Sequence, residues 1–469
     1  MNTPSTPSGD AQADRRPSSR SAATPRPSGP HRYALVGTGA RAGLYVDAIA
    51  GQYQSTARLV GLCDKNAGRL QLARHRVREL GGGEPATCLP AGFEAMLAAT
   101  KAETVFVITP DATHHEYIIR AMHAGCDVIS EKPLTTTPEM CQEILDARAR
   151  TGRTCRVTFN LRYSPTCLQV KELLAQGKIG DILSVDFHWM LDSAHGTDYF
   201  RRWHSHKADS GGLMIHKATH HFDLVNWWLG AVPTSVYATG KREFYTPTMA
   251  RRMGLTGPHE RCLTCPEADR CGFRLDLRKD PYLKALYLDQ ENHDGYFRDR
   301  CVFRPDIDIE DTMNVLVRYN TGTTLAYSLN AFNAWEGYTI AFNGTRGRLE
   351  YNFGAPPAAD GKKQSEAARI TIIPLRGAAR EITPAAGTGG HQGGDSIMLD
   401  DLLLTSHPAD PHLRAADERA GAAAALIGMA ANRCFATGQP VEIASLVKNL
   451  RNPDYSPMPS SEAPVPMPR

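Results

Sequence analysis

The side chains best suited to move a proton are two histidines spaced four residues apart. His216 and His220 fall within residues 215–229, whose apolar pattern predicts a helix that ends at Gly230. Side chains at i and i+4 share one helix face, and Asp223 at i+7 joins them. The pair could bind a metal ion, but the glutamate of the zinc hydrolase motif H-E-x-x-H is absent, which disfavours that chemistry. A packed core histidine is the alternative interpretation of His220.

A cysteine cluster could hold a metal ion. Its members are Cys262, Cys265, Cys271 and the more distant Cys301. The C-x2-C-x5-C spacing resembles that of thiolate metal sites; zinc is the expected ion, and an iron–sulfur cluster is the alternative. His259 could replace Cys301 as a ligand. We expect the ion to fix an insertion over residues 248–304, although free or disulfide-linked thiols also fit the spacing.

A glycine-rich loop near the start of the chain points to a dinucleotide. An apolar run over residues 33–37 leads into G-x-G-x-x-A, and an apolar helical pattern follows. In such a loop the glycines permit a tight turn and close approach of the backbone to a pyrophosphate. The expected contacts come from Gly37, Thr38, Gly39, Ala40 and Arg41.

An acidic residue follows the next predicted strand at the distance typical of dinucleotide-binding folds. Asp64 ends the strand over residues 58–63, where a carboxylate can accept hydrogen bonds from the adenosine ribose. Because a carboxylate repels a 2′-phosphate, NAD is favoured over NADP, while Arg41 and Lys65 leave NADP as the alternative. Asp64 could instead cap the following helix.

Two more strands, over residues 104–108 and 127–130, alternate with helical patterns. This rhythm predicts a parallel sheet whose carboxyl edge binds the ligand, in a domain over residues 31–152. The residues at or just beyond strand ends, and hence expected to contact the cofactor, are Thr109, Pro110, His114, Glu131 and Lys132.

The rest of the chain has strand patterns without intervening helices. Residues 156–160 and 182–189 read as strands, and a hairpin is predicted over residues 312–332. These runs favour an antiparallel sheet in an α+β domain over residues 153–450. The fold class is therefore α/β, with a Rossmann domain followed by this second domain.

The composition excludes several classes of function. A net charge of +3 gives no electrostatic basis for binding nucleic acid, and no apolar stretch is long enough to span a membrane. The odd count of eleven cysteines, without a secretory signal, favours a reducing cytoplasm. The polar, proline-rich tails over residues 1–30 and 451–469 are expected to be disordered.

Several motifs together resemble the Gfo/Idh/MocA family, which includes glucose–fructose oxidoreductase and inositol dehydrogenase. The motifs are Thr-Pro-Asp-Ala-Thr-His114, Glu131-Lys132-Pro133, Arg162-Tyr-Ser-Pro165, Gly211-Gly212 with His220 and Asp223, and Gly-Gly-Asp395. They occur in the family's order over roughly residues 32–445. The resemblance identifies a family but no substrate.

The resemblance implies a Rossmann domain followed by a domain with a large, open, mostly antiparallel sheet that often mediates homo-oligomerisation. It places Lys132 between nicotinamide and substrate, with a proline after it that is commonly cis, and makes His220 the general base. The substrate is then expected to meet Arg162, Trp203, His216 and Lys217. His216 stands where many relatives have an aspartate that orients the histidine matching His220. The usual pair of a histidine base and an aspartate is therefore in question for this chain.

The leading hypothesis is hydride transfer between NAD and a secondary hydroxyl of a sugar or polyol. His220 would accept the hydroxyl proton and Lys132 would stabilise the charge that develops on the oxygen. The first alternative is an NAD-using glycoside hydrolase or lyase that oxidises the sugar transiently. The second is a dinucleotide sensor without catalysis, which the presence of both Lys132 and His220 disfavours.

Overall fold

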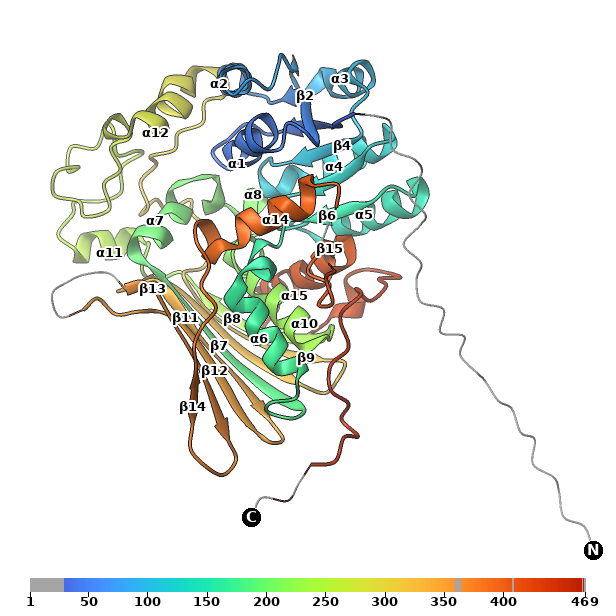
Figure 1. The fold of residues 1–469 in the computed structure, drawn as a ribbon. Helices are drawn as coiled ribbons and strands as arrows, with labels where there is room; N and C mark the ends of the chain where they lie inside the picture. Colours follow the sequence, from blue (N-terminus) through green and yellow to red (C-terminus); the bar gives the residue numbers. More distant parts are fainter. Residues whose placement is uncertain (1–28, 359–363, 407–408, 466, 468–469) are drawn as a thin grey trace, which may run out of the picture.

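The computed structural model describes residues 29–358, 364–406, 409–465 and 467. These residues form two sheets, each with its own helices, stacked along the long direction of the molecule (Figure 1). The predicted disordered segment 1–30 lies, apart from its last two residues, outside the described residues. In the part of the chain that the structure describes, no helix is long and apolar enough to cross a membrane.

The first sheet has seven strands in the order β15-β6-β5-β4-β1-β2-β3. Strands β1 to β6 run parallel, and β15 pairs antiparallel with β6. The strand bounds are β1 His31–Val36, β2 Ala57–Cys63, β3 Ala86–Cys88, β4 Thr104–Val107, β5 Asp127–Ser130, β6 Cys155–Val157 and β15 Ala416–Asp417. The strand expected at 156–160 in the second domain is thus shorter and belongs to this sheet, because it pairs with β5.

Helices pack against this parallel sheet, as its almost fully buried strands require. They are α1 Ala42–Asp47, which continues as the π-helix η1 Ala48–Gln52, then α2 Ala67–Glu79, α3 Phe93–Thr100, α4 His114–His123 and α5 Pro138–Thr151. Parallel strands end at a common edge, so the loops after β1, β4 and β5 converge there. The predicted α/β fold is confirmed.

The second sheet has nine strands in the order β14-β13-β12-β11-β7-β10-β9-β8-β16 and is antiparallel except where β10 pairs with β7. The bounds are β7 Ile182–Asp192, β8 Pro233–Lys241, β9 Thr312–Tyr319, β10 Thr324–Asn333, β11 Gly337–Gly344, β12 Gly347–Ala355, β13 Gln364–Pro374, β14 Arg380–Ile382 and β16 Val441–Glu442. Burial alternates along β9, so one face packs on the core and the other meets solvent.

Helices cover the core-facing side of this sheet. They are α6 Pro165–Ala175, α10 Thr219–Leu229 and the alanine-rich α15 Glu418–Thr437, which lies against β8 and α10. The single helix expected over 215–229 is interrupted: α9 Leu213–His216 ends, the chain turns at Lys217 and Ala218, and α10 begins. His216 and His220 therefore lie on different helices rather than on one face.

A long connection joins β8 to β9 and contains the four cysteines of the predicted metal cluster. It includes α11 Pro247–Arg252, the 3-10 turn η6 Leu277–Lys279, α12 Pro281–Leu286, η7 Leu288–Gln290 and α13 Glu291–Asp294. In Figure 1 this segment arches from the second domain up to α2 of the first. We call residues 248–304 the insertion.

The end of the chain corrects one prediction. Residues 451–465, expected to be disordered, form neither helix nor strand but pack on the second domain, and Ser456 is 5% exposed. The Arg162 guanidinium lies 5.6 Å from the Tyr455 ring, and the Nζ atom of Lys171 lies 3.1 Å from the Met458 sulfur. Partly buried aromatic and thioether groups hold a segment whose composition suggested disorder.

Candidate active site

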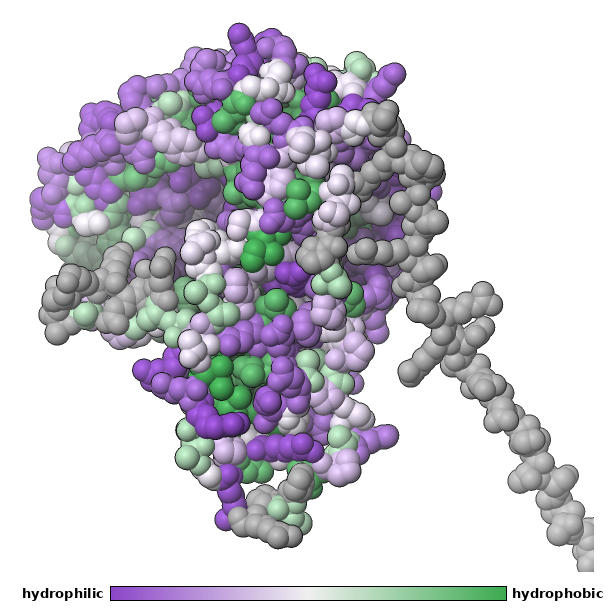
Figure 2. All heavy atoms as spheres, in the orientation of Figure 1, coloured by the Kyte–Doolittle hydropathy of each residue, from purple (hydrophilic) through white to green (hydrophobic). Residues whose placement is uncertain are grey.

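A cavity of about 770 Å³ lies at the carboxyl edge of the first sheet, between the two domains and the insertion. Ten of its lining residues were predicted cofactor ligands: Gly37, Gly39, Ala40, Arg41, Asp64, Thr109, Pro110, His114, Glu131 and Lys132. From the second domain it takes Trp203, His204, His216, Lys217 and His220. The molecular face beneath the insertion is hollowed and mostly hydrophilic (Figure 2).

The loop after β1 has the backbone that a dinucleotide requires. Gly37 has a φ of 93°, and a Cβ there would lie 2.5 Å from the carbonyl oxygen of Ile108, so only glycine fits. A Cβ on Gly39 would lie 3.7 Å from the Tyr287 hydroxyl. The loop and Asp64 line one end of the cavity and Lys132 lines the same space, which is large enough for a dinucleotide.

Asp64 organises the loop as well as facing the cavity. Its Oδ2 accepts from the backbone N–H of Thr38 at 2.6 Å and from the Thr38 hydroxyl at 2.9 Å. Its Oδ1 accepts from the backbone N–H of Asn66 at 2.7 Å. Thr38, predicted to bind the cofactor, is thus turned onto Asp64 and is not among the lining residues.

A buried ionic chain links the loop to the catalytic edge. Arg41 donates to Glu131 at 2.6 Å and to Asp395 at 3.1 Å, and Tyr45 donates to Glu131 at 2.7 Å. Burial alone would raise the pKa of Glu131, but Arg41 and the other donors outweigh it and hold that pKa below its usual value. Glu131 therefore carries a negative charge one residue before Lys132.

Lys132 projects from the loop after β5 toward the second domain. Its Nζ donates to the backbone carbonyl of His216 at 3.0 Å, and the Lys132–Pro133 peptide bond is cis, as the family resemblance implies. Burial lowers the Lys132 pKa, which makes the ammonium a better hydrogen-bond donor to a reacting oxygen. His114 lies between the carbonyls of Thr109 and Pro133, at 2.9 and 2.8 Å, and so ties two strand ends together.

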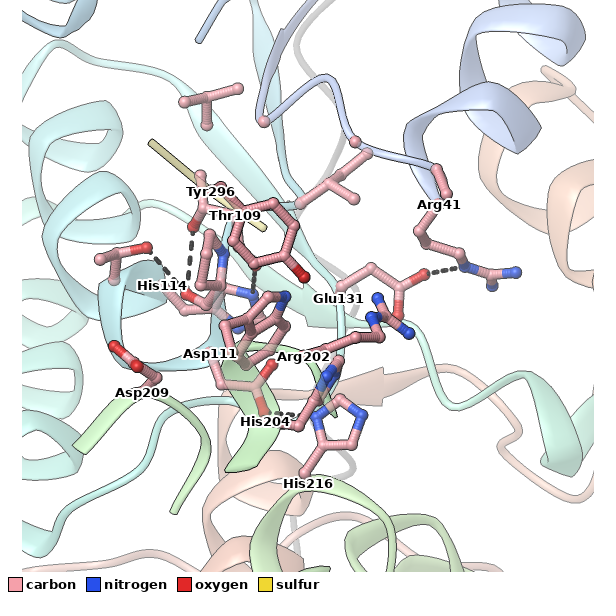
Figure 3. A pocket seen from close by; sticks show the side chains of 18 of the residues that line it. Arg41, Thr109, Asp111, His114, Glu131, Arg202, His204, Asp209, His216 and Tyr296 are labelled. Atoms are coloured by element: carbon pink, nitrogen blue, oxygen red, sulfur yellow. Dashed lines mark hydrogen bonds and ion pairs between the residues drawn. The ribbon is translucent and has the colours of Figure 1, made fainter. Parts of the chain in front are cut away.

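His216 has a carboxylate partner from the other domain. Its Nδ1 lies 2.6 Å from Oδ2 of Asp111, a residue of the 3-10 turn η3 Asp111–Thr113 that follows β4 (Figure 3). Burial raises the pKa of Asp111 and lowers that of His216, so the contact holds one shared proton rather than a fully charged pair. Asp111 thus pairs with the histidine at the position of the motif aspartate and not with His220.

His220 lines the cavity without such a partner. Its Nδ1 is buried and has no hydrogen-bond partner among the described residues. Burial, followed by the charge of Lys132, lowers the pKa of His220 well below its usual value, so the ring is neutral. Its ring neighbours are Phe159 at 6.1 Å and His391 at 6.2 Å, measured between ring centroids.

Aromatic and cationic groups complete the second-domain wall. The Trp203 ring stacks on His204 at 3.7 Å, and the His204 ring meets that of His216 at 4.1 Å. Burial lowers the pKa of Lys217 to about 8, and its Nζ lies 5.0 Å from the Trp189 ring centroid. Trp203, His216 and Lys217, three of the residues predicted to meet substrate, therefore line the same cavity as Lys132.

Arg162 does not reach the cavity, contrary to the expectation that it binds substrate. It is 1% exposed and makes two hydrogen bonds to Asp223, at 2.8 and 2.6 Å. An isolated buried carboxylate is costly, and a bidentate guanidinium is its best partner. The pair therefore anchors α10 to the segment before α6.

Several lining residues were not predicted from the sequence as site residues: Asp111, Asp198, Tyr287, Tyr296 and His391. Asp111 follows directly after two predicted ligands, so its position at a strand end was a usable signal. The two tyrosines come from the insertion, and no spacing in the sequence predicts that the insertion returns to the first domain.

The four cysteines of the cluster line one small cavity, of about 20 Å³. Cys262, Cys265, Cys271 and Cys301 are all free thiols and partly exposed. Across the described residues, no three His, Cys, Asp or Glu side chains are arranged closely enough to hold a metal ion. The structure thus brings together the cysteines that the spacing grouped, but not at metal-ligand distances.

Known proteins share this architecture. Solved structures include aldose-aldose oxidoreductase from Caulobacter crescentus, with 16% identity, a TM-score of 0.59 and coverage of 88% of this chain and 99% of that one. The WlbA dehydrogenase from Bordetella pertussis, in complex with NADH and UDP-GlcNAcA, has 20% identity, a TM-score of 0.59 and coverage of 88% and 98%. At these identities the likeness shows the fold.

The sequence is similar to a Bacillus subtilis (strain 168) protein named "Putative oxidoreductase YteT", with 34% identity over 86% of this chain and 95% of that one. D-glucoside 3-dehydrogenase of Escherichia coli (strain K12) is 31% identical over 43% of this chain and 55% of its own length. Two family models match: the NAD-binding Rossmann fold over residues 31–159 and the C-terminal alpha/beta domain over residues 171–443. The chain belongs to the Gfo/Idh/MocA oxidoreductase family.

Proposed function

We propose that this oxidoreductase transfers a hydride between NAD and a secondary hydroxyl of a sugar or polyol. The observation that carries the proposal is a partly buried lysine that lines one cavity with two neutral histidines at the carboxyl edge of a Rossmann sheet. Relatives named inositol 2-dehydrogenase and D-glucoside 3-dehydrogenase support a carbohydrate or polyol substrate. The polar and aromatic wall with Trp203 and Lys217 suits the hydroxyls and ring faces of such a ligand.

Bound NAD would supply the hydride acceptor. Lys132 would donate a hydrogen bond to the reacting oxygen and stabilise the negative charge that develops there. A neutral histidine would accept the hydroxyl proton. His216 fits this step if its ring donates Nδ1–H to an ionised Asp111, which leaves Nε2 free to accept a proton; a protonated Asp111 would donate to Nδ1 and leave the step to His220. The family motif favours His220.

The same groups could serve an NAD-using glycoside hydrolase or lyase, in which oxidation of the sugar is only transient. A dinucleotide sensor without catalysis would need only the glycine-rich loop of the Rossmann domain.

The test is a panel of sugars, polyols and aryl glycosides incubated with purified protein and NAD. We expect NADH absorbance to rise with at least one free sugar or polyol. Release of the aryl group with NAD unchanged would instead favour the hydrolase.

Replacement of each candidate base should identify the proton acceptor. If His216 is the base, His216→Asn should lower kcat by roughly a hundredfold or more. Asp111→Asn should then lower kcat in the same direction, because it removes the group that orients the ring. The measurement is steady-state kinetics on the best substrate of the panel, with exposed His188→Asn as the control. A loss confined to His220→Asn would assign the step to His220.

The preference for NAD rests on Asp64. Asp64→Ala should weaken NAD binding by about tenfold or more and narrow the difference from NADP, because hydrogen bonds to the ribose and repulsion of a 2′-phosphate are both lost. Thr38→Val is the matched control: it removes one hydroxyl contact to Asp64 but leaves the carboxylate, so the NAD to NADP ratio should not change. Equal affinity of the unaltered protein for both cofactors, measured by fluorescence titration, would contradict the prediction.

A structural zinc at the cysteine cluster is a second proposal, supported by the lining of one small cavity by all four thiols. Binding requires the side chains to draw together and lose their protons. We expect about one zinc per chain by elemental analysis, lost in Cys265→Ser and retained in Cys88→Ser, which lies outside the cluster. Metal-free protein of full activity would rule the zinc out.

Two further proposals concern assembly and compartment. The solvent face of the second sheet exposes Tyr237, Leu183 and Leu316, by 41%, 59% and 57%, which supports a homo-oligomer formed through that face. The eleven cysteines are all free, which supports a reducing compartment such as the cytoplasm.

A further inference from the structure

The insertion returns to the first domain and contacts its glycine-rich loop. The backbone N–H of Ala40 donates to the hydroxyl of Tyr287 at 3.1 Å, and the hydroxyl of Tyr282 donates to the carbonyl of Ala40 at 3.4 Å. In the described part of the chain, the Tyr287 hydroxyl has no acceptor for its own proton. The insertion, some 240 residues away in sequence, thus forms two hydrogen bonds to the loop that would face the cofactor.

Two more contacts hold the insertion against the start of α2. The side-chain amide of Asn66 donates to the carbonyl of Gln290 at 3.0 Å, and Arg69 forms an ion pair with Asp294. Tyr287 and Asp294 also line the large cavity, as do the two residues that follow Asp294. The insertion is therefore a wall of the cofactor cavity opposite the glycine-rich loop.

Next to this wall, three guanidinium groups share one carboxylate, and two members of the group, Asp198 and Arg202, line the cavity themselves. Asp198 lies 3.6 Å from Arg201, 3.1 Å from Arg202 and 3.2 Å from Arg298. Asp198 is the only carboxylate within ion-pair distance of these arginines among the described residues, so three positive charges face one negative charge. Nε of Arg202, and Nε and Nη1 of Arg298, are buried without hydrogen-bond partners.

The unpaired positive charge lies next to the tyrosine that contacts the loop. The Arg298 guanidinium lies 4.7 Å from the centroid of the Tyr287 ring. Arg202 lines the cavity, and Figure 3 places it near Asp111 and His204. Buried donors without partners are costly, and an anion between the loop and the insertion would offset that cost.

We infer that the insertion is a clamp that closes on the pyrophosphate of the dinucleotide. The excess of two positive charges matches the two negative charges of a diphosphate. Tyr287 would donate its free proton to a phosphate oxygen. Arg202, which lines the cavity, and Arg298, which lies against the Tyr287 ring, would supply charge from the side opposite the backbone N–H groups. The inference rests on the dinucleotide binding of the proposed function.

The base of the clamp is braced within the insertion. Arg261 donates to Glu291 at 2.9 and 2.6 Å and to Asp299 at 2.9 Å, and the backbone N–H of Cys262 donates to the carbonyl of Asp299 at 2.8 Å. These contacts join the cysteine region to the segment that leads to Arg298. A clamp fixed in this way should slow cofactor release rather than change its chemistry.

The test is the rate at which bound NADH leaves the full-length protein, followed by fluorescence after displacement with excess NAD. Tyr287→Phe should speed release by about fivefold, the loss expected for one hydrogen bond. Arg298→Met keeps the bulk of the side chain and removes its charge, and should speed release by about tenfold or more. Arg278→Met is the matched control, because Arg278 lies in the same insertion and, among the described residues, its side chain pairs only with the nearby Asp276.

Release from Tyr287→Phe at the rate of the unaltered protein, with the fold intact by circular dichroism, would overturn the clamp. So would an equal acceleration in Arg278→Met, because the effect would then belong to the insertion's stability. If the unaltered protein binds NADH and the clamp variants release it at the same rate as the unaltered protein, the clamp is overturned but the proposed function still stands. Absence of any NADH binding would overturn both.

Discussion

The hydrogen bond between Asp111 and His216 joins the two domains at the point where the chemistry would occur. It crosses from the end of β4 to the end of α9, and the bond from Lys132 to the His216 carbonyl crosses beside it. Lys132 and Asp111 come from the first domain and His216 from the second. The candidate active site therefore forms only when the second domain packs against the carboxyl edge of the Rossmann sheet.

Burial sets the protonation of this site. It lowers the pKa values of Lys132, His216 and His220 and raises that of Asp111, so each group moves toward its neutral form. A neutral imidazole can accept a proton from an alcohol, whereas an imidazolium cannot. Asp111 and then Glu131, which Arg41 holds ionised, offset part of the lowering of the Lys132 pKa by burial.

Local features were predictable from the sequence. The glycine-rich loop, Asp64 and Lys132 depend on a turn or a strand end, which short stretches of sequence specify. Contacts between distant segments were not predictable: Asp111 meets His216 across 105 residues, and the insertion meets Ala40 across 247. The break between α9 and α10 went unseen because the apolar pattern continues through it. Arg162 was misassigned because a motif position does not show which way its side chain points.

In the proposed reaction, a hydride passes directly between the carbon of a sugar hydroxyl and the nicotinamide in this cavity. The most direct measurement uses a substrate that carries deuterium on that carbon, incubated with the protein and NAD, with mass spectrometry of the nucleotide afterwards. The account predicts that one deuterium per turnover appears on the nicotinamide ring. Product formation with no deuterium on the nicotinamide, and with the label released to water, would contradict it.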